Sequence, residues 1–166
     1  MTDYQRITTS ELDILPSRTR ANLINKLSGY KSPVLIGTTN TTGIDNLSIV
    51  TSLLHIGSHP PLLGFVLRPQ VLGFSHTLKN IKANKQLTIS HIHEDIVHQA
   101  HRCSAKFPEN ISEFEAVKLT PYICELPFWT APAVEESKIR MGLSLNSIIE
   151  LPNKCNLIIG RIEWVE

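Results

Sequence analysis

The feature that most constrains this chain is a pair of predicted strands within residues 43–69, joined by a short connection that contains two consecutive prolines. The first strand, about residues 46–56, carries small hydroxyl residues among its apolar ones: Ser48, Thr51 and Ser52. The second, residues 62–67, is nearly all apolar and is followed by Arg68. Branched side chains give such a pair a surface, and hydroxyls and backbone amides add fixed polar contacts. The pair therefore predicts the floor of a ligand site, with Arg68 placed to meet an anion.

Length and composition indicate one globular domain over residues 1–166. The chain has 42% hydrophobic and 19% charged residues with a formal net charge of +1, and 166 residues are enough to bury a core. Binding to a nucleic acid backbone needs several clustered Lys or Arg residues, so we expect no nucleic acid partner.

The N-terminal residues and the cysteines both favour the cytoplasm. Residues 1–10 lack the basic-then-apolar order of a signal peptide, and no stretch is long and apolar enough to span a bilayer. We therefore expect a cytoplasmic protein without a membrane partner. The cysteines are odd in number and lack C-x-x-C spacing, which favours reduced thiols: Cys103, Cys124 and Cys155.

The N-terminal half alternates turn signals with short periodic segments. Residues 1–15 are expected to be an extended lead-in, and residues 18–27 have helical spacing that ends at Ser28-Gly29. A strand over 33–39 and a turn at 40–43 predict a hairpin with the hydroxyl-bearing strand. Ser75 is a candidate N-cap for a helix over 75–82.

The C-terminal half continues the same pattern. Strands are expected at 86–92, 139–145 and 155–165, with a short helix at 94–102. Asn110 and Glu113 have the spacing of a capping box, so a brief helix should carry Phe114 and Val117 inward. In the loop-rich residues 121–132 we expect three aromatic anchors: Tyr122, Phe128 and Trp129. The whole pattern predicts a mainly β chain with short helices, arranged as an antiparallel barrel.

Several familiar catalytic motifs are missing from the sequence. There is no G-x-G-x-x-G, no Walker lysine loop and no G-x-S-x-G elbow, and the cysteines lack a context that lowers a thiol pKa. The catalytic residues are therefore unknown at this point. A metal site is conceivable where four histidines fall close together, but their spacing matches no zinc signature, so we expect no metal: His91, His93, His98 and His101.

Two further segments extend the predicted ligand site. The helix that starts at Ser75-His76-Thr77 follows Arg68 closely, and exposed N–H groups at a helix N-terminus favour an anion such as phosphate. The loop around His101, Ser104 and Lys106 offers a donor, a hydroxyl and a cation within six residues. Alternatively, the hydroxyls lie on an exposed strand face and Arg68 is a surface charge.

Three segments carry a resemblance to a known family: residues 32–69, 76–92 and 98–115. The first contains the asparagine, the hydroxyl strand and the double proline. On these residues the chain resembles the flavin reductase-like family with the FMN-binding split β-barrel. The resemblance implies an antiparallel FMN-binding split barrel and a homodimer that holds FMN non-covalently at the subunit interface.

The resemblance also implies a role for each matching residue. Five residues would line the isoalloxazine ring: Asn46, Ser48, Thr51, Ser52 and Leu53. Four would meet or approach the ribityl phosphate: Arg68, His76, Thr77 and Asn80. Three would close the site from the loop: His101, Ser104 and Lys106. The chain departs from the family at Ser90, where the family often has Asn, and matches it least from residue 121 onward.

The family's chemistry leaves three functions to compare. The first is an NAD(P)H-dependent flavin oxidoreductase, in which NADH or NADPH is a transient co-substrate and electrons pass through bound FMN to a flavin, oxygen or an acceptor protein. The second is a non-catalytic FMN-binding electron carrier or flavin-storage protein. The third is a flavin-free member that keeps the barrel as a binding or dimer scaffold. In the first two the flavin supplies the chemistry and the protein positions it.

Overall fold

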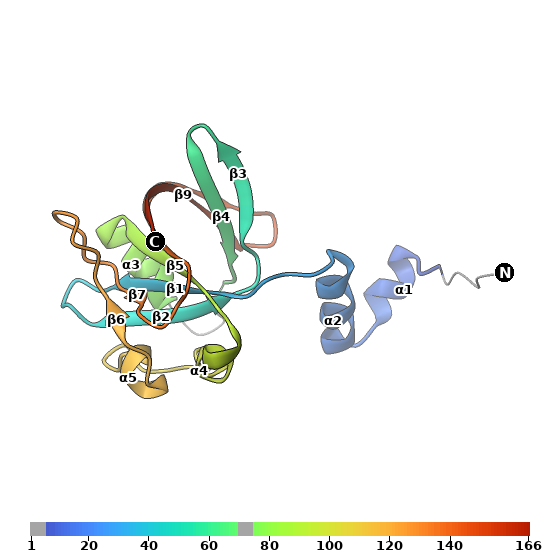
Figure 1. Ribbon diagram of the computed structural model, residues 1–166. Coiled ribbons are helices and arrows are strands. Elements are labelled where there is room, and N and C mark those ends of the chain that lie inside the picture. Colours follow the sequence, from blue (N-terminus) through green and yellow to red (C-terminus); the bar gives the residue numbers. More distant parts are fainter. Residues whose placement is uncertain (1–5, 70–74) are drawn as a thin grey trace. The chain divides into compact units, whose positions relative to one another are not determined.

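The computed structural model describes residues 6–69 and 75–166 (Figure 1). The chain divides into two compact units, Met1–Lys31 and Ser32–Glu166, and each is described by itself. Whether they form one domain, as expected from the sequence, stays a prediction. None of the helices in the described ranges is long and apolar enough to cross a membrane.

The first unit contains two helices, α1 (Thr9–Ile14) and α2 (Ser17–Leu27). The prediction of an extended lead-in is wrong where α1 begins, because Thr8 and Glu11 form a capping box that starts a helix. The Thr8 N–H donates to Glu11 Oε2 at 2.7 Å. The helix predicted for residues 18–27 is confirmed and begins one residue earlier. Arg20 Nη1 donates to the Asp13 carbonyl oxygen at 2.9 Å and ties α2 to the end of α1.

The second unit is built on one antiparallel sheet with the strand order β2-β1-β5-β8-β9-β4-β3. This confirms the mainly β, antiparallel fold. The strands of the first half are β1 (Val34–Thr39), β2 (Asp45–Val50), β3 (Leu54–Ser58) and β4 (Pro61–Leu67). Those of the second half are β5 (Gln86–His91), β8 (Arg140–Glu150) and β9 (Asn156–Val165). A separate two-stranded sheet joins β6 (Pro121–Tyr122) to β7 (Ala133–Val134).

The single strand predicted for residues 46–56 is wrong, because it is two strands at opposite edges of the sheet. β2 ends at Val50 and β3 begins at Leu54. Between them, Ser52 Oγ accepts the N–H of Val66 at 2.8 Å and donates to the Val66 carbonyl oxygen at 3.2 Å. Ser52 thus attaches the end of β2 to β4 and closes the sheet into a barrel. Alternation of polar and apolar residues continues through such a change of neighbour, so the pattern alone does not reveal it.

Four helical segments accompany the sheet: α3 (His76–Asn84), η1 (Glu94–Ile96), α4 (Val97–Arg102) and α5 (Glu113–Val117). Figure 1 shows α3 on one side of β1 and β2, and α4 and α5 on the other. The barrel core joins Ile36, Phe65 and Leu143 to Ile81 of α3. A second core packs Leu35 and Leu47 against Phe114 and other residues of η1, α4 and α5. β1 and β2 are therefore covered on both faces.

Two expectations for the C-terminal half are wrong in detail. The N-cap of α5 is Ser112, and Glu113 makes no capping box with Asn110, because its carboxylate bonds the backbone of β2 instead. Phe128 is 94% exposed and anchors nothing, whereas Trp129 is buried. The inward positions of Phe114 and Val117 are confirmed, at 2% and 1% exposed.

Candidate functional site

A buried chain of polar side chains links β2 to the first turn of α3. Asn46 Nδ2 donates to Thr77 Oγ1 at 3.1 Å, and the Thr77 hydroxyl donates to Ser48 Oγ at 3.0 Å. Asn46 and Thr77 are 7% and 4% exposed. Because alternate residues of a strand face the same side, Asn46 and Ser48 both reach the helix. The structure thus brings together three residues predicted to bind one ligand.

The N-terminus of α3 is oriented by its own cap. Ser75 Oγ accepts the N–H of Leu78 at 3.3 Å, and the Ser75 carbonyl accepts the N–H of Lys79 at 2.9 Å. This confirms Ser75 as the N-cap and leaves the N–H groups of His76 and Thr77 without an acceptor among the described residues. Those two N–H groups and the positive end of the helix dipole form a place for an anion.

Asn80 serves mainly to seat α3 on the sheet. Its Nδ2 donates to Thr38 Oγ1 of β1 at 3.1 Å, and the side chain is only 3% exposed. Asn80 lies one turn after the N-terminus of α3. Its bond to Thr38 therefore fixes the position of His76 and Thr77 relative to the sheet.

Residues 51–53 connect β2 to β3 and form a seam, where Ser52 is bonded to β4. These residues are the three remaining predicted ring contacts. Thr51 is exposed, whereas Leu53 packs against the barrel core. The Ser52 hydroxyl is already engaged by the backbone of Val66. Of the three, Thr51 has an exposed side chain that makes no hydrogen bond to another described residue, and Ser52 holds the seam.

Arg68 lies at the end of β4, exposed, and directly precedes the Pro69 that ends the described segment. Its predicted contact with an anion stays a prediction. His101, Ser104 and Lys106 are also exposed, at the end of α4 and in the segment after it. The Ser104 hydroxyl donates to the His101 carbonyl at 2.7 Å, which closes the end of the helix. Among the described residues, no hydrogen bond joins this group to the chain of Asn46, Thr77 and Ser48.

A small hollow that is open to solvent lies beside this polar chain. Its walls come from the turn between β1 and β2, from β2 and α3, and from the segment that leads into α5. Three lining residues, Asn46, His76 and Asn80, were predicted from the sequence as site residues. The others were not: Asn40, Ile44, Asp45, Glu109, Ile111 and Glu113.

Two carboxyl groups in this hollow are partly removed from water. Burial raises the pKa of Asp45 and of Glu113 above their ordinary values. Thr39 Oγ1 donates to Asp45 Oδ1 at 2.8 Å, and the Leu47 N–H donates to Glu113 Oε2 at 3.0 Å. Each carboxyl is thus held by one oxygen. The sequence singled out Glu113 as part of a capping box. Only the structure shows that its carboxylate faces β2 instead.

The described part of the chain holds no cluster of metal-ligating side chains, and Cys103 is not an activated thiol. No three His, Cys, Asp or Glu side chains there come together to hold an ion. Burial raises the pKa of Cys103 to about 12, so its thiol stays protonated at neutral pH. The Cys103 thiol is therefore a poor nucleophile at neutral pH.

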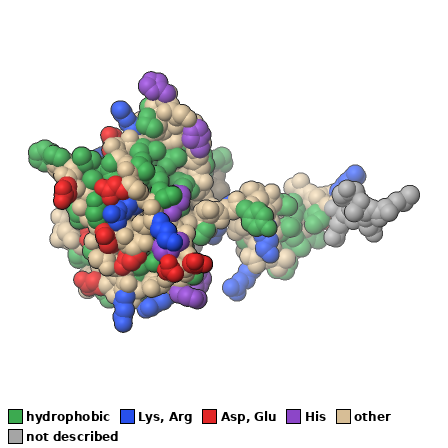
Figure 2. Space-filling view, viewed as in Figure 1, with side chains coloured by type: hydrophobic (Ala, Val, Ile, Leu, Met, Phe, Trp, Pro, Cys, Tyr) green, Lys and Arg blue, Asp and Glu red, His purple; other side chains and the backbone are tan. Residues whose placement is uncertain are grey.

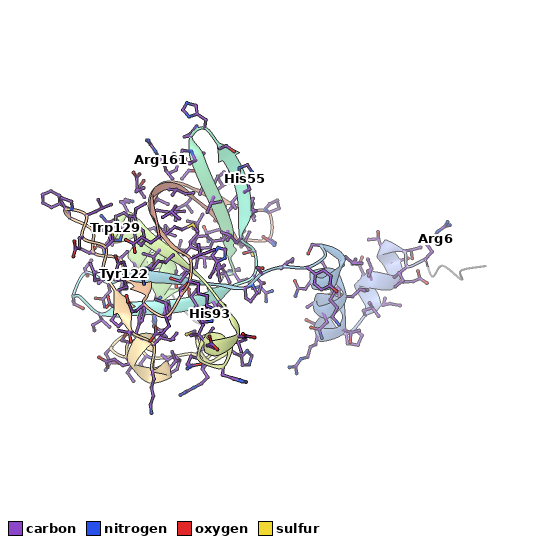
Figure 3. The ribbon with its side chains drawn as sticks, in the orientation of Figure 1. Arg6, His55, His93, Tyr122, Trp129 and Arg161 are labelled. Atoms are coloured by element: carbon purple, nitrogen blue, oxygen red, sulfur yellow. The ribbon has the colours of Figure 1, made fainter. Side chains whose placement is uncertain are left out.

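An aromatic cluster supports the sheet on the β6–β7 side, where Tyr122 and Trp129 lie (Figure 3). The ring of Trp164 lies 5.8 Å from that of Trp129 and 6.4 Å from that of Tyr122, with edge-to-face geometry in both pairs. The Arg140 guanidinium stands 3.6 Å from the centroid of the Tyr122 ring. Acidic and basic side chains are interspersed over the visible face of Ser32–Glu166 (Figure 2).

A family model and a solved structure point to the same protein family. The sequence model of the flavin reductase like domain matches residues 27–166. The chain is similar to a protein from Shewanella frigidimarina NCIMB 400 that is assigned as a flavin reductase with a split barrel domain. The two are 40% identical over 98% of this chain and 79% of that one, with a TM-score of 0.89. No curated protein matches the sequence significantly.

Two further structures share the fold. Component B of nitrilotriacetate monooxygenase from Bacillus cereus is 23% identical over all of this chain and 82% of that one, with a TM-score of 0.87. Flavoredoxin of Desulfovibrio vulgaris (Miyazaki F) is 26% identical over 82% of this chain and 69% of that one, with a TM-score of 0.71.

Proposed function

Because the chain belongs to the flavin reductase-like family, we propose that it is an NAD(P)H-dependent flavin oxidoreductase that passes electrons through non-covalently bound FMN. The observation that supports this most is the buried chain of Asn46, Thr77 and Ser48. A hydrogen-bonded polar chain holds its members in fixed positions, and this one ends at a helix N-terminus suited to a phosphate.

The residues present fit FMN at both of its ends. The N–H groups of His76 and Thr77 and the cation of Arg68 would hold the phosphate, and Thr51 at the seam of the barrel would contact the ring. Asn46 and Ser48 fix the Thr77 hydroxyl, so the first turn of α3 is already oriented before a ligand arrives. Bound flavin would supply the hydride-accepting ring.

The assembly and the acceptor are part of the same proposal. A homodimer with FMN at its interface is supported by the edge strand β3, on which Leu54 and Ile56 are each 38% exposed. An unpaired edge with apolar side chains favours association with another chain. We propose that His101, Ser104 and Lys106 close the site in that assembly, that the protein acts in the cytoplasm, and that a flavin or an acceptor protein takes the electrons.

The visible spectrum of the purified protein tests the proposal. We expect flavin absorption after addition of FMN, and bleaching when NADH or NADPH is added without oxygen. Protein that binds no FMN would contradict both the oxidoreductase and a flavin carrier. Protein that binds FMN but bleaches with neither nicotinamide would be a carrier or storage protein. Thr77→Val removes the hydroxyl that joins Asn46 to Ser48 and so tests the proposed site. Thr120→Val, outside the site, is its control.

A further inference from the structure

His76 is the residue of the hollow beside α3 whose side chain can carry a positive charge; the other described lining residues are neutral or acidic. It begins α3 and is half-buried, and three carboxyl groups line the same hollow: Asp45, Glu109 and Glu113. The cavity volume is about 10 Å³, which is room for one water. The charges of these side chains must therefore be balanced by one another, because nothing larger than a water fits between them.

The three carboxyl groups differ in how far their charge is already balanced. Glu109 is exposed and forms an ion pair with Lys79. Asp45 and Glu113 lie deeper, and each accepts a hydrogen bond from a neutral donor, a hydroxyl or a backbone N–H. Burial raises the pKa of Glu113, and a positive charge on His76 acts in the opposite direction. The imidazole of His76 is therefore close enough to Glu113 to respond to its charge.

The same imidazole belongs to the residue on which the proposed phosphate would rest. The N–H groups of His76 and Thr77, at the start of α3, form the place for an anion. A phosphate monoester carries close to two negative charges at neutral pH, and nearby negative charges favour the protonated form of an imidazole. A phosphate at the start of α3 therefore adds to the attraction that the carboxyl groups of the hollow already exert on a proton.

We infer that a ring nitrogen of His76 takes up a proton from solvent when the phosphate of FMN binds, and that Asp45 and Glu113 set the pH at which it does so. The inference rests on the proposed function, because it needs the phosphate of FMN at the start of α3. A proton gained on binding makes the affinity highest where the imidazole is already charged and lowers it as pH rises. The charged groups around the hollow and the proposed phosphate place are Asp45 of β2, Lys79 of α3, Glu109 before α5, Glu113 of α5 and Arg68 after β4.

The experiment counts the proton and follows the affinity for FMN with pH. Calorimetric titration with FMN at about pH 7.5, in two buffers of different ionisation enthalpy, gives the proton uptake. Flavin fluorescence gives the affinity from about pH 7 to pH 9, where the phosphate of FMN stays almost fully ionised. The wild type should take up a proton and lose about tenfold in affinity over this range. His76→Gln keeps the backbone N–H but cannot titrate, so it should take up no proton and keep a nearly constant affinity.

Two further variants test the carboxyl groups and the choice of histidine. Glu113→Gln keeps an acceptor for the Leu47 N–H but removes a negative charge beside His76, so the fall in affinity should move to lower pH. His98→Gln, at an exposed position of α4 outside the hollow, should keep the pH dependence of the wild type. The unfolding midpoint shows whether each variant has folded.

The outcomes separate this inference from the proposed function. FMN binding by the wild type without proton uptake, or an equal fall in affinity in the wild type and His76→Gln, overturns the inference alone. A fall in affinity at the same pH in Glu113→Gln as in the wild type also overturns it, because the carboxyl groups would then not set that pH. If His76→Gln does not fold, the proton count of the wild type decides. Absence of FMN binding by the wild type at every pH overturns the proposed function instead.

Discussion

The carboxylate of Glu113 accepts the backbone N–H of Leu47 at 3.0 Å, on the open side of the edge strand β2. An edge strand has no neighbour for its outward N–H groups, and here a side chain takes the place of a strand. Since Leu47 stands between Asn46 and Ser48, this one contact sets the position of the polar chain that reaches α3. It also joins the segment of α4 and α5 to the candidate site.

Replacing Glu113 separates its hydrogen bond from its charge. Glu113→Leu leaves the buried Leu47 N–H without an acceptor and should lower the free energy of unfolding by about 1–3 kcal/mol. Glu113→Gln keeps an acceptor and should be far less costly. Urea unfolding measures both. Equal losses in the two variants would show that the hydrogen bond is not what stabilises β2.

The stability of the two forms should also diverge with pH. Burial raises the pKa of Glu113, so ionising it costs more in the folded chain than in the unfolded one. Wild-type stability therefore falls as pH rises from the ordinary carboxyl pKa of 4.5 through the raised value, and Glu113→Gln lacks this loss. Relative to the wild type, the free energy of unfolding of Glu113→Gln should therefore be higher at pH 8 than at pH 5. Asp45 is present in both proteins, so its titration cancels in the comparison. A difference in the free energy of unfolding that does not change with pH would therefore contradict the prediction.

Arg68→Ala should weaken FMN binding without changing stability. Arg68 is exposed and stands at the end of β4, so its loss removes a charge-assisted contact to phosphate and no packing. A hydrogen bond to a charged group contributes about 1.5–3 kcal/mol, or roughly 10- to 150-fold in affinity. Fluorescence titration with FMN measures it, and Arg161→Ala, another exposed arginine, is the control. Unchanged affinity would remove Arg68 from the phosphate site.

Thr51→Val should alter the environment of the flavin ring rather than the hold on its phosphate. Thr51 is exposed at the seam and its side chain makes no hydrogen bond to any described residue, so the nearly isosteric change spares the fold. We expect a shifted visible spectrum of the FMN complex with an affinity close to that of the wild type. A spectrum identical to the wild type would place the ring elsewhere.

Gly142→Ala should disrupt the aromatic cluster. A Cβ at this position would lie 2.0 Å from Trp164 Nε1 and 2.5 Å from Trp129 Cζ2, so β8 or the rings must move. Overpacking of this kind costs about 1–3 kcal/mol or more. The chain has two tryptophans and both are in the cluster, so the intrinsic fluorescence should shift as the unfolding midpoint falls. Gly57→Ala, which meets only an ordinary contact at 3.5 Å, should change neither.

What the sequence predicted well is local in origin. The hairpin of β1 and β2 follows from a turn between two periodic runs, and the start of α3 follows from the Ser75 cap. The inward positions of Phe114 and Val117 follow from helical spacing. In each case the deciding residues lie within a few positions of one another.

What the sequence did not predict depends on residues far apart in the chain. Glu113 looks like part of a capping box until β2, 66 positions earlier, is placed beside it. In the sequence, Ser52 looks like one more hydroxyl of a continuous strand. Only the structure shows that it accepts the N–H of Val66. Of the predicted site, the fold brings Asn46, Ser48 and Thr77 together. No hydrogen bond among the described residues joins His101, Ser104 and Lys106 to them.

The attachment of Ser52 to Val66 gives the barrel a built-in reporter. Most amide hydrogens of a sheet are held by a neighbouring strand and exchange with solvent only when strands separate. The amide of Val66 is held by a hydroxyl at the seam, so it exchanges when that seam opens locally as well as when the whole chain unfolds. Its protection measured with and without FMN would therefore reveal whether a ligand that sits on Thr51 locks the barrel shut.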